Sequence, residues 1–209
     1  SLMSTVVECV GRFIKVYRST FLPHLHQHLL PIVQVLLPPD RTPNDRTAAL
    51  CVFDDIIEHC SSDGSSSPYI APVMPLLMRY CQDDAPEVRQ AACYGFGVLA
   101  QHAGAAFNDA QCLEATRTLV AVVQAPDARS EENETATDNA VSALGKMLLH
   151  RAAVVNVEAI LPIFLGYLPV KADLMEAQVV HAQLCTMAET MGAGLLGPSG
   201  ERAPVVATL

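Results

Sequence analysis

The sequence predicts an all-α protein in which pairs of helices stack side by side into an α-α superhelix. Apolar residues recur with helical spacing along almost all of the 209 residues, whereas alternating strand patterns are scarce. Breaks rich in proline, glycine and serine separate segments of helix length. In addition, several of these segments resemble one another at offsets of 40 to 48 residues.

The pattern predicts a leading helix followed by about four helix pairs, which together form one array. The expected helices lie at about 3–17, 20–37, 43–60, 68–81, 86–103, 109–124, 132–150, 157–168 and 174–191. The expected repeats are 19–62, 66–104, 107–151 and 155–192, with 1–18 as the second helix of a preceding repeat and 193–209 as a tail. Because the connections are short, successive helices are expected to form hairpins.

The internal repeat is visible when PNDRTAALCVFDDIIEHC is placed under PEVRQAACYGFGVLAQHA without a gap. Pro43 then matches Pro86, Arg46 matches Arg89 and His59 matches His102, at an offset of 43 residues. A further shift of 48 residues places TDNAVSALGKML on RQAACYGFGVLA. Two-helix units of this length are the size of HEAT or armadillo repeats.

Small residues within the helix that begins at Pro86 predict a close contact between helices. Ala91, Ala92, Gly95 and Gly97 lie inside this segment, although glycine costs a helix about 1 kcal/mol relative to alanine. In a solenoid each repeat packs mainly on its neighbours, so small side chains allow two backbones to approach.

Composition narrows the class of function. The formal net charge of −9 argues against a nucleic-acid surface, which needs cationic side chains, and favours basic partners. No apolar run approaches the length of a membrane span. The seven cysteines are scattered and odd in number, which predicts reduced thiols in a cytosolic or nuclear protein.

Four motifs carry a resemblance to a known family. DDAPEVRQAACYGFGVLA is similar to the HEAT signature. Together with DRTAALCVFDDIIEHC, ETATDNAVSALGKML and VNVEAILPIFLGYLPVKAD, it resembles consecutive stretches of the importin-beta superfamily, and most of all the karyopherin beta-three (importin-five) type. The resemblance covers about residues 22–198 and implies a C-terminal HEAT-repeat fragment of a nuclear import receptor.

The resemblance implies a transport function and a set of partners. Such receptors shuttle between cytoplasm and nucleus, bind basic cargo proteins that carry nuclear localisation signals, contact nucleoporins and respond to Ran-GTP. The Ran-GTP site lies mainly in N-terminal repeats that this chain lacks. The alternative is a generic HEAT-repeat scaffold without a transport role. Neither reading predicts an enzyme, a cofactor, or a direct contact with nucleic acid or membrane.

The resemblance also implies that the second helix of each repeat lines the concave, partner-facing side. Helical geometry then selects the stripe opposite the expected core residues Val88, Ala92, Phe96 and Leu99. The candidate partner-binding residues are Asp54, Asp55, Glu58, Tyr94, Gln101, Asp138, Ser142 and Glu189. The acidic cluster among them suits a basic partner, although a merely solvated helix face remains the alternative.

Arg46 and Arg89 occupy the same repeat position and predict a structural ladder with the turn carboxylates Asp83 and Asp84. A partner-binding role is the alternative. Thr137 replaces the arginine one repeat later, so that junction is expected to be less regular. The polar segment 126–135 is expected to be a solvated loop or, alternatively, a partner-specific element.

Other constellations do not support a chemical site. Only His24 and His28, of the group His24, His26 and His28, would share a helix face, and no carboxylate or thiolate nearby completes a metal set. GFGVLA imitates a dinucleotide-binding loop but follows a helix-forming run instead of a strand. An enzyme such as a base-excising glycosylase would need a basic face, which the negative charge opposes.

Overall fold

The computed structural model describes residues 2–197 and 199–207, and every regular element in that part of the chain is helical. The elements are α1 Leu2–Tyr17, η1 Arg18–Thr20, α2 Leu22–His24, η2 Leu25–Leu29, α3 Leu30–Leu36, α4 Pro43–Cys60, α5 Ser67–Tyr80, α6 Pro86–His102, η3 Gly104–Ala106, α7 Asp109–Val123, α8 Glu134–His150, α9 Val157–Tyr167, α10 Leu174–Met191, η4 Gly192–Leu196 and α11 Ala203–Val206. The predicted all-α stack of helix pairs is confirmed.

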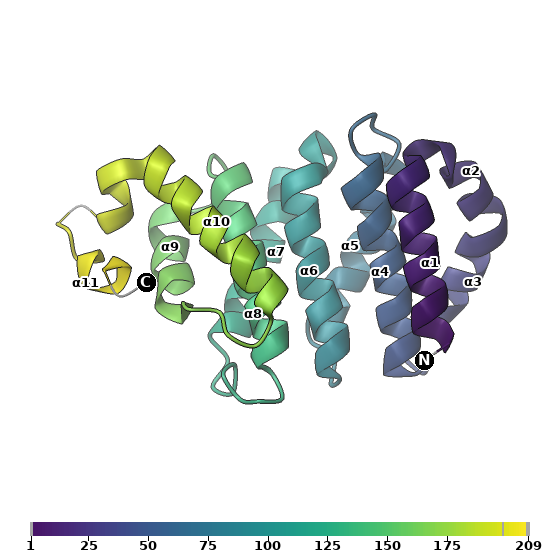
Figure 1. The fold of residues 1–209 in the computed structure, drawn as a ribbon, viewed down its shortest axis with the longest axis horizontal. Helices are drawn as coiled ribbons and strands as arrows, with labels where there is room; N and C mark the ends of the chain where they lie inside the picture. Colours follow the sequence, from purple (N-terminus) through teal and green to yellow (C-terminus); the bar gives the residue numbers. More distant parts are fainter. Residues whose placement is uncertain (1, 198, 208–209) are drawn as a thin grey trace.

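The helices form two layers that run along the molecule (Figure 1). Helices α1, α4, α6, α8 and α10 lie side by side in the front layer, which we call the second-helix face. Helices α5 and α7 lie behind them, whereas α2 and α3 lie beside α1 at one end and α9 lies beside α10 toward the other end. A continuous apolar core fills the space between the layers.

Proline and polar caps at the helix starts explain where several front helices begin. Pro43 and Pro86 occupy the first turns of α4 and α6, where the absent N–H has no partner to lose. The Thr42 side chain accepts a hydrogen bond from the backbone N–H of Asp45 at 3.2 Å. The Asp173 side chain caps α10 in the same manner.

The expected helix 20–37 is interrupted, which corrects the sequence-based boundary. It divides into α2, the π-helical turn η2 and α3. Pro31 lies in the first turn of α3, immediately after the wide turn. Proline has no N–H to donate, and its ring crowds the carbonyl group four residues earlier, so a wider turn relieves the clash.

The glycines of α6 lie at two contacts between neighbouring helices. A methyl group at Gly95 would lie 2.5 Å from Asp54 Oδ1, on α4, and 2.8 Å from a methyl carbon of Leu77, on α5. A methyl group at Gly97 would lie 3.2 Å from the Cα atom of Ala143, on α8. Both glycines therefore offset their poor helix propensity by allowing neighbouring helices to pack closely.

Substitution of Gly97 by alanine is expected to destabilise the fold by about 1 kcal/mol, because the cost of overpacking exceeds the gain in helix propensity. The new methyl group would press on the backbone of α8, which cannot rotate away. Gly166→Ala is the matched control, since nothing lies within 4 Å of a methyl group at that helical position. Urea unfolding should show a lower free energy of unfolding for Gly97→Ala and a free energy of unfolding higher by up to about 1 kcal/mol for Gly166→Ala. Equal gains would contradict close packing at Gly97.

Candidate functional site

Three side chains from successive front helices meet on the second-helix face. Glu58, on α4, accepts a hydrogen bond from the phenol of Tyr94, on α6, with Oη and Oε2 2.8 Å apart. The Nζ atom of Lys146, on α8, lies 5.0 Å from the centroid of the Tyr94 ring. An acid, an aromatic ring and a cation therefore follow one another across three repeats.

Asp55 lies beside Glu58 and faces α1. Its carboxylate approaches the backbone at Gly11 so closely that a methyl group there would collide with it. Partial burial, assisted by the negative charge of Glu58 and opposed by Lys15, raises the pKa of Asp55 to about 6. The Nε2 atom of His59 lies 3.9 Å from Asp55 Oδ1. Asp55 and Glu58 both remain partly exposed.

Asp54 does not belong to this exposed surface, which corrects the expectation for that residue. It is only 3% exposed, and neither carboxylate oxygen has a hydrogen-bond partner among the described residues. Burial, together with the charges of Asp55 and Glu58, raises the pKa of Asp54 well above its usual value. Helical geometry alone placed Asp54 on the exposed side of α4. In the front layer, however, α4 packs between α1 and α6, and Asp54 faces Gly95 on α6.

Asp138 and Ser142 are also buried, so the expectation that they face a partner is corrected as well. Every residue of α8 from Ala136 to Leu148 is buried, because α6, α7, α9 and α10 all pack against this helix. Asp138 accepts hydrogen bonds from the backbone N–H groups of Ala172 and Asp173, at 2.8 and 2.9 Å. Its carboxylate therefore holds the connection that leads into α10.

The remaining members of the expected stripe are accessible. Gln101 and Glu189 are exposed, and Tyr94 is partly exposed. Glu58, Tyr94 and Gln101 lie along depressions in the surface, whereas Glu189 lines none of those described below.

Arg46 connects its own turn to the turn of the next repeat. Its Nη2 atom lies 2.8 Å from Asp83 Oδ1, and both side chains are about nine-tenths buried. Its Nη1 atom donates to the backbone carbonyl groups of Pro39 and Arg41. The guanidinium group therefore bridges the junction between the first two helix pairs.

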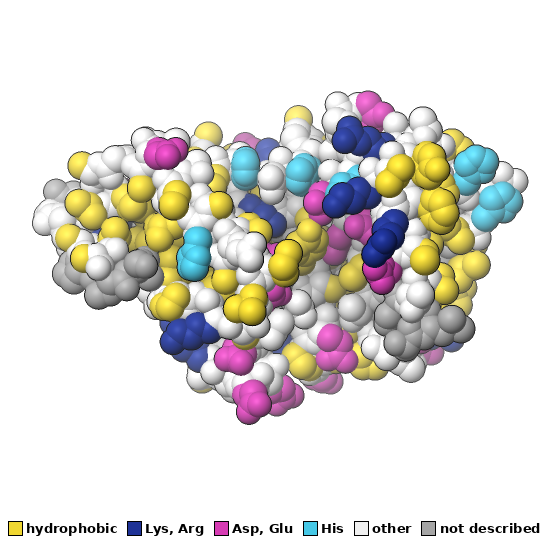
Figure 2. Space-filling view, in the orientation of Figure 1, with side chains coloured by type: hydrophobic (Ala, Val, Ile, Leu, Met, Phe, Trp, Pro, Cys, Tyr) yellow, Lys and Arg dark blue, Asp and Glu magenta, His cyan; other side chains and the backbone are white. Residues whose placement is uncertain are grey.

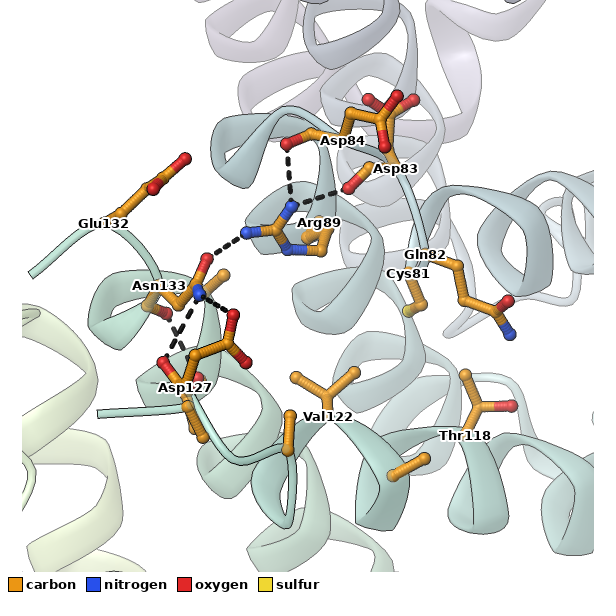
Figure 3. A pocket seen from close by; sticks show the side chains of 15 residues that line it. Cys81, Gln82, Asp83, Asp84, Arg89, Thr118, Val122, Asp127, Glu132 and Asn133 are labelled. Atoms are coloured by element: carbon orange, nitrogen blue, oxygen red, sulfur yellow. Dashed lines mark hydrogen bonds between the residues drawn. The ribbon is translucent and has the colours of Figure 1, made fainter. Parts of the chain in front are cut away.

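Arg89 makes the equivalent contacts one repeat later (Figure 3). It donates to the carbonyl groups of Asp83 and Asp84, at 2.6 and 2.9 Å, and to the side chain of Asn133. Arg89 bonds to the backbone carbonyl of Asp84 and not to its carboxylate, which the predicted ladder had invoked. Asn133 also donates to Asp127, so part of the expected solvated loop 126–135 is held in the junction.

At the third junction, Thr137 occupies the repeat position of Arg46 and Arg89, and Arg129 provides the bridging arginine instead. Arg129 donates to the carbonyl groups of Gly166 and Tyr167, at 3.1 and 2.9 Å. Its guanidinium carbon also lies 4.2 Å from the centroid of the Tyr167 ring. The cation thus reaches the following repeat from the loop before α8 instead of from the helix itself.

The described part of the chain holds no group of three histidine, cysteine, aspartate or glutamate side chains arranged to bind a metal ion. Within the same residues, no helix combines the length and the apolar character that a membrane span requires.

Comparisons with known proteins agree with this architecture. A model of the HEAT repeat matches residues 73–103, which include α6. The probable importin subunit beta-4 of Schizosaccharomyces pombe is 26% identical over 166 residues, which cover 79% of this chain and 15% of that protein. Importin subunit beta-3 of Saccharomyces cerevisiae is 28% identical over 191 residues, which cover 90% of this chain and 17% of that protein. The chain is thus similar to importin beta subunits over most of its length.

A solved structure shows the same fold. The crystal structure of Kap121p bound to RanGTP superposes with a TM-score of 0.78 at 22% identity, over 99% of this chain and 20% of Kap121p. The chain thus spans about one sixth of the length of the two curated importins that it matches.

Sequence reasoning missed one feature of this segment and found only part of another. Lys146 contacts Tyr94 and lies opposite Glu58 on the same ring, yet a lone lysine in α8 gives no motif. Three histidines, at positions 59, 102 and 150, occur at equivalent repeat positions. The offset of 43 residues already matches His59 with His102, and the offset of 48 residues would have added His150.

Proposed function

We propose that this chain is part of a nuclear import receptor and that its second-helix face contributes to binding basic protein cargo. Similarity to importin subunits beta-3 and beta-4 supports a receptor that shuttles between cytoplasm and nucleus. Solved structures of the related Kap121p hold RanGTP, the nucleoporin Nup53p or the SUMO protease Ulp1p. For the whole receptor we propose the same classes of partner, with Ran-GTP bound mainly by other repeats.

The observation that carries the proposal is a groove between α1, α4 and α6, which we call the acidic groove. Its volume is about 540 Å³, and Asp55, Glu58 and Tyr94 are among the lining residues. Arg12 and Glu8, also in the lining, pair with each other at 2.6 Å. The other charged residues in the lining are Lys15, Asp55 and Glu58. One cation therefore faces two carboxylates, and the groove retains negative charge.

A lysine side chain of a partner fits this groove chemically. Its ammonium group would lie between Asp55 and Glu58, and its methylene groups would pack along Ala48, Cys51 and the Tyr94 ring. Partial burial raises the pKa of Asp55, and repulsion from the Glu58 carboxylate adds to the shift. A bound cation would relieve that repulsion, which favours basic over neutral segments.

The combined substitution Asp55→Asn with Glu58→Gln is expected to weaken binding of a lysine-rich peptide about tenfold at low salt, because two charge contacts of up to about 1 kcal/mol each are lost. A fluorescent eight-residue peptide with four lysines and no acidic residue serves as the probe. Fluorescence anisotropy with the 209-residue chain measures the dissociation constant at 50 and 300 mM salt. The difference between the variants should shrink at the higher salt.

The matched control is Glu114→Gln with Glu131→Gln, which changes the net charge equally but lies elsewhere. Both glutamates are exposed, one on α7 and one in the loop before α8. This control should bind the peptide as tightly as the unmodified chain. Equal weakening in both variants would mean that only overall charge matters, and absence of binding by the unmodified chain would reject the groove as a cargo site.

A further inference from the structure

Three histidines form a row across the second-helix face. His59, His102 and His150 lie in the last turns of α4, α6 and α8, at equivalent positions of three successive repeats. Figure 2 shows histidine side chains following one another across the upper part of this face. We call these three residues the histidine row.

The histidine row borders three adjoining depressions, one of which is the acidic groove, and we call them together the furrow. A depression of about 250 Å³ at the ends of α4 and α6 shares Glu58 and His59 with the acidic groove. This depression also contains His102, and it shares Gln101 with a third depression of about 660 Å³ between α8 and α10. The third depression contains His150. The furrow therefore crosses the helices and meets one imidazole in each of three repeats.

The dimensions of the furrow suit an extended segment of a partner chain. Neighbouring helices pack about 8–10 Å apart, so the path from α1 to α10 is roughly 35 Å long. An extended chain advances about 3.3 Å per residue, so about ten residues would cover this path. Such a segment would pass the acidic groove and the histidine row together.

Both signs of charge surround His59. Asp55 and Glu58 lie on the same helix, whereas Lys15 and Arg18 approach from α1 and η1. Burial lowers the pKa of His59, with the two cations adding to the effect and Glu58 opposing it. The imidazole is therefore neutral at pH 7.5.

The other two imidazoles have similar surroundings. Burial lowers the pKa of His102, Glu58 opposes this, and Lys146, His150 and His59 reinforce it. Burial also lowers the pKa of His150, with Arg151 and Lys146 acting in the same direction. All three side chains thus bind protons only at acidic pH, where each adds a positive charge beside the furrow.

We propose that a basic partner segment lies in this furrow and that its binding is coupled to the loss of protons from the histidine row. The proposal rests on the proposed function, because it concerns the same basic partner. At neutral pH the uncharged row leaves Asp55 and Glu58 free to attract a cation. When the row is protonated, its charges repel that cation, and His59 competes for Asp55 at close range.

The coupling has a definite sign. A bound cation makes protonation of the nearby imidazoles less favourable, so at acidic pH the complex holds fewer protons than the separate partners. Affinity therefore falls as pH decreases. Asp55 reinforces the effect, because its pKa of about 6 means that its charge is lost in the same range.

The test measures the dissociation constant of the lysine-rich peptide between pH 7.5 and pH 5.5. We expect the affinity of the unmodified chain to fall at least tenfold over this range. The combined variant His59→Gln, His102→Gln and His150→Gln should lose most of this dependence, with about a threefold change remaining from Asp55. Calorimetry in buffers of different ionisation enthalpy should show proton release on binding at pH 6, and a smaller release in the variant, where Asp55 still contributes.

The matched control removes three other histidines, through His24→Gln, His26→Gln and His28→Gln. These side chains are exposed on α2 and η2, outside the second-helix face, and should leave the pH profile unchanged. The single variant His102→Gln guards against misfolding of the triple variant, since it should remove about a third of the effect. Circular dichroism at each pH verifies the fold.

The outcomes separate the two proposals. If the unmodified chain fails to bind the peptide at pH 7.5, the proposed function and the coupling are both rejected. If it binds with an unchanged pH profile in the triple variant, the coupling is rejected and cargo binding stands. A profile altered equally by the control variant would likewise reject the histidine row as the source.

Discussion

Replacing Asp54 with asparagine is expected to raise the free energy of unfolding by about 2 kcal/mol at pH 7. The carboxyl group is fully buried without a hydrogen-bond partner among the described residues, so it must take up a proton to remain in the fold. Because an unfolded aspartate has a pKa of about 3.9, that protonation costs up to about 4 kcal/mol at pH 7. Asparagine avoids this cost but buries an amide without a partner, which offsets part of the gain.

The gain should depend on pH in a specific direction. The folded-state pKa of Asp54 is raised, so the penalty is small near pH 4 and grows as pH increases above the unfolded pKa. Urea unfolding at pH 5 and pH 8 should therefore show a larger advantage for the asparagine variant at pH 8. Destabilisation by this substitution would instead mean that Asp54 is ionised and held by the charge of Lys146.

Replacing Arg46 with methionine is expected to lower the free energy of unfolding by about 3 kcal/mol. The side chain is buried and bonds to Asp83 across a repeat junction, so its loss leaves a nearly buried carboxylate without a cation. Two carbonyl groups of the preceding turn lose their donor as well. Methionine preserves most of the aliphatic packing, which isolates the effect of the guanidinium group.

The control is Arg12→Met, which removes an exposed arginine paired with Glu8 at 2.6 Å. Surface pairs of this kind contribute about 0–1 kcal/mol, so this variant should differ little from the unmodified chain. Adding Asp83→Asn to Arg46→Met should recover part of the loss, because the unpaired charge is removed. A loss no larger than that of Arg12→Met would contradict the structural role of Arg46.

The architecture could be predicted because the repeat and the helical period are both local properties of the chain. Pro43 and Pro86 begin matching helices, and Gly97 lies at the close contact between α6 and α8 for which small residues are required. The interruption before Pro31 was not predicted, because sequence alone does not distinguish a widened turn from an ordinary helix start.

The candidate site was less predictable because burial of a front helix depends on both of its neighbours. Asp54 and Asp55 are adjacent in sequence, yet the first faces Gly95 in the interior and the second faces the acidic groove. Asp138 and Ser142 lie in the part of α8 that neighbouring helices cover, and both side chains are buried.

By itself the sequence determined the all-α class, the repeat length, the equivalence of Arg46 and Arg89, and the excess of negative charge, because each follows from residue type and spacing. Only the tertiary structure decided which carboxylates face solvent and that Arg129 spans the third junction. It also joined Glu58, Tyr94 and Lys146 across three repeats. Such contacts depend on how neighbouring helices are rotated and separated. Packing between residues that are distant in the sequence determines both.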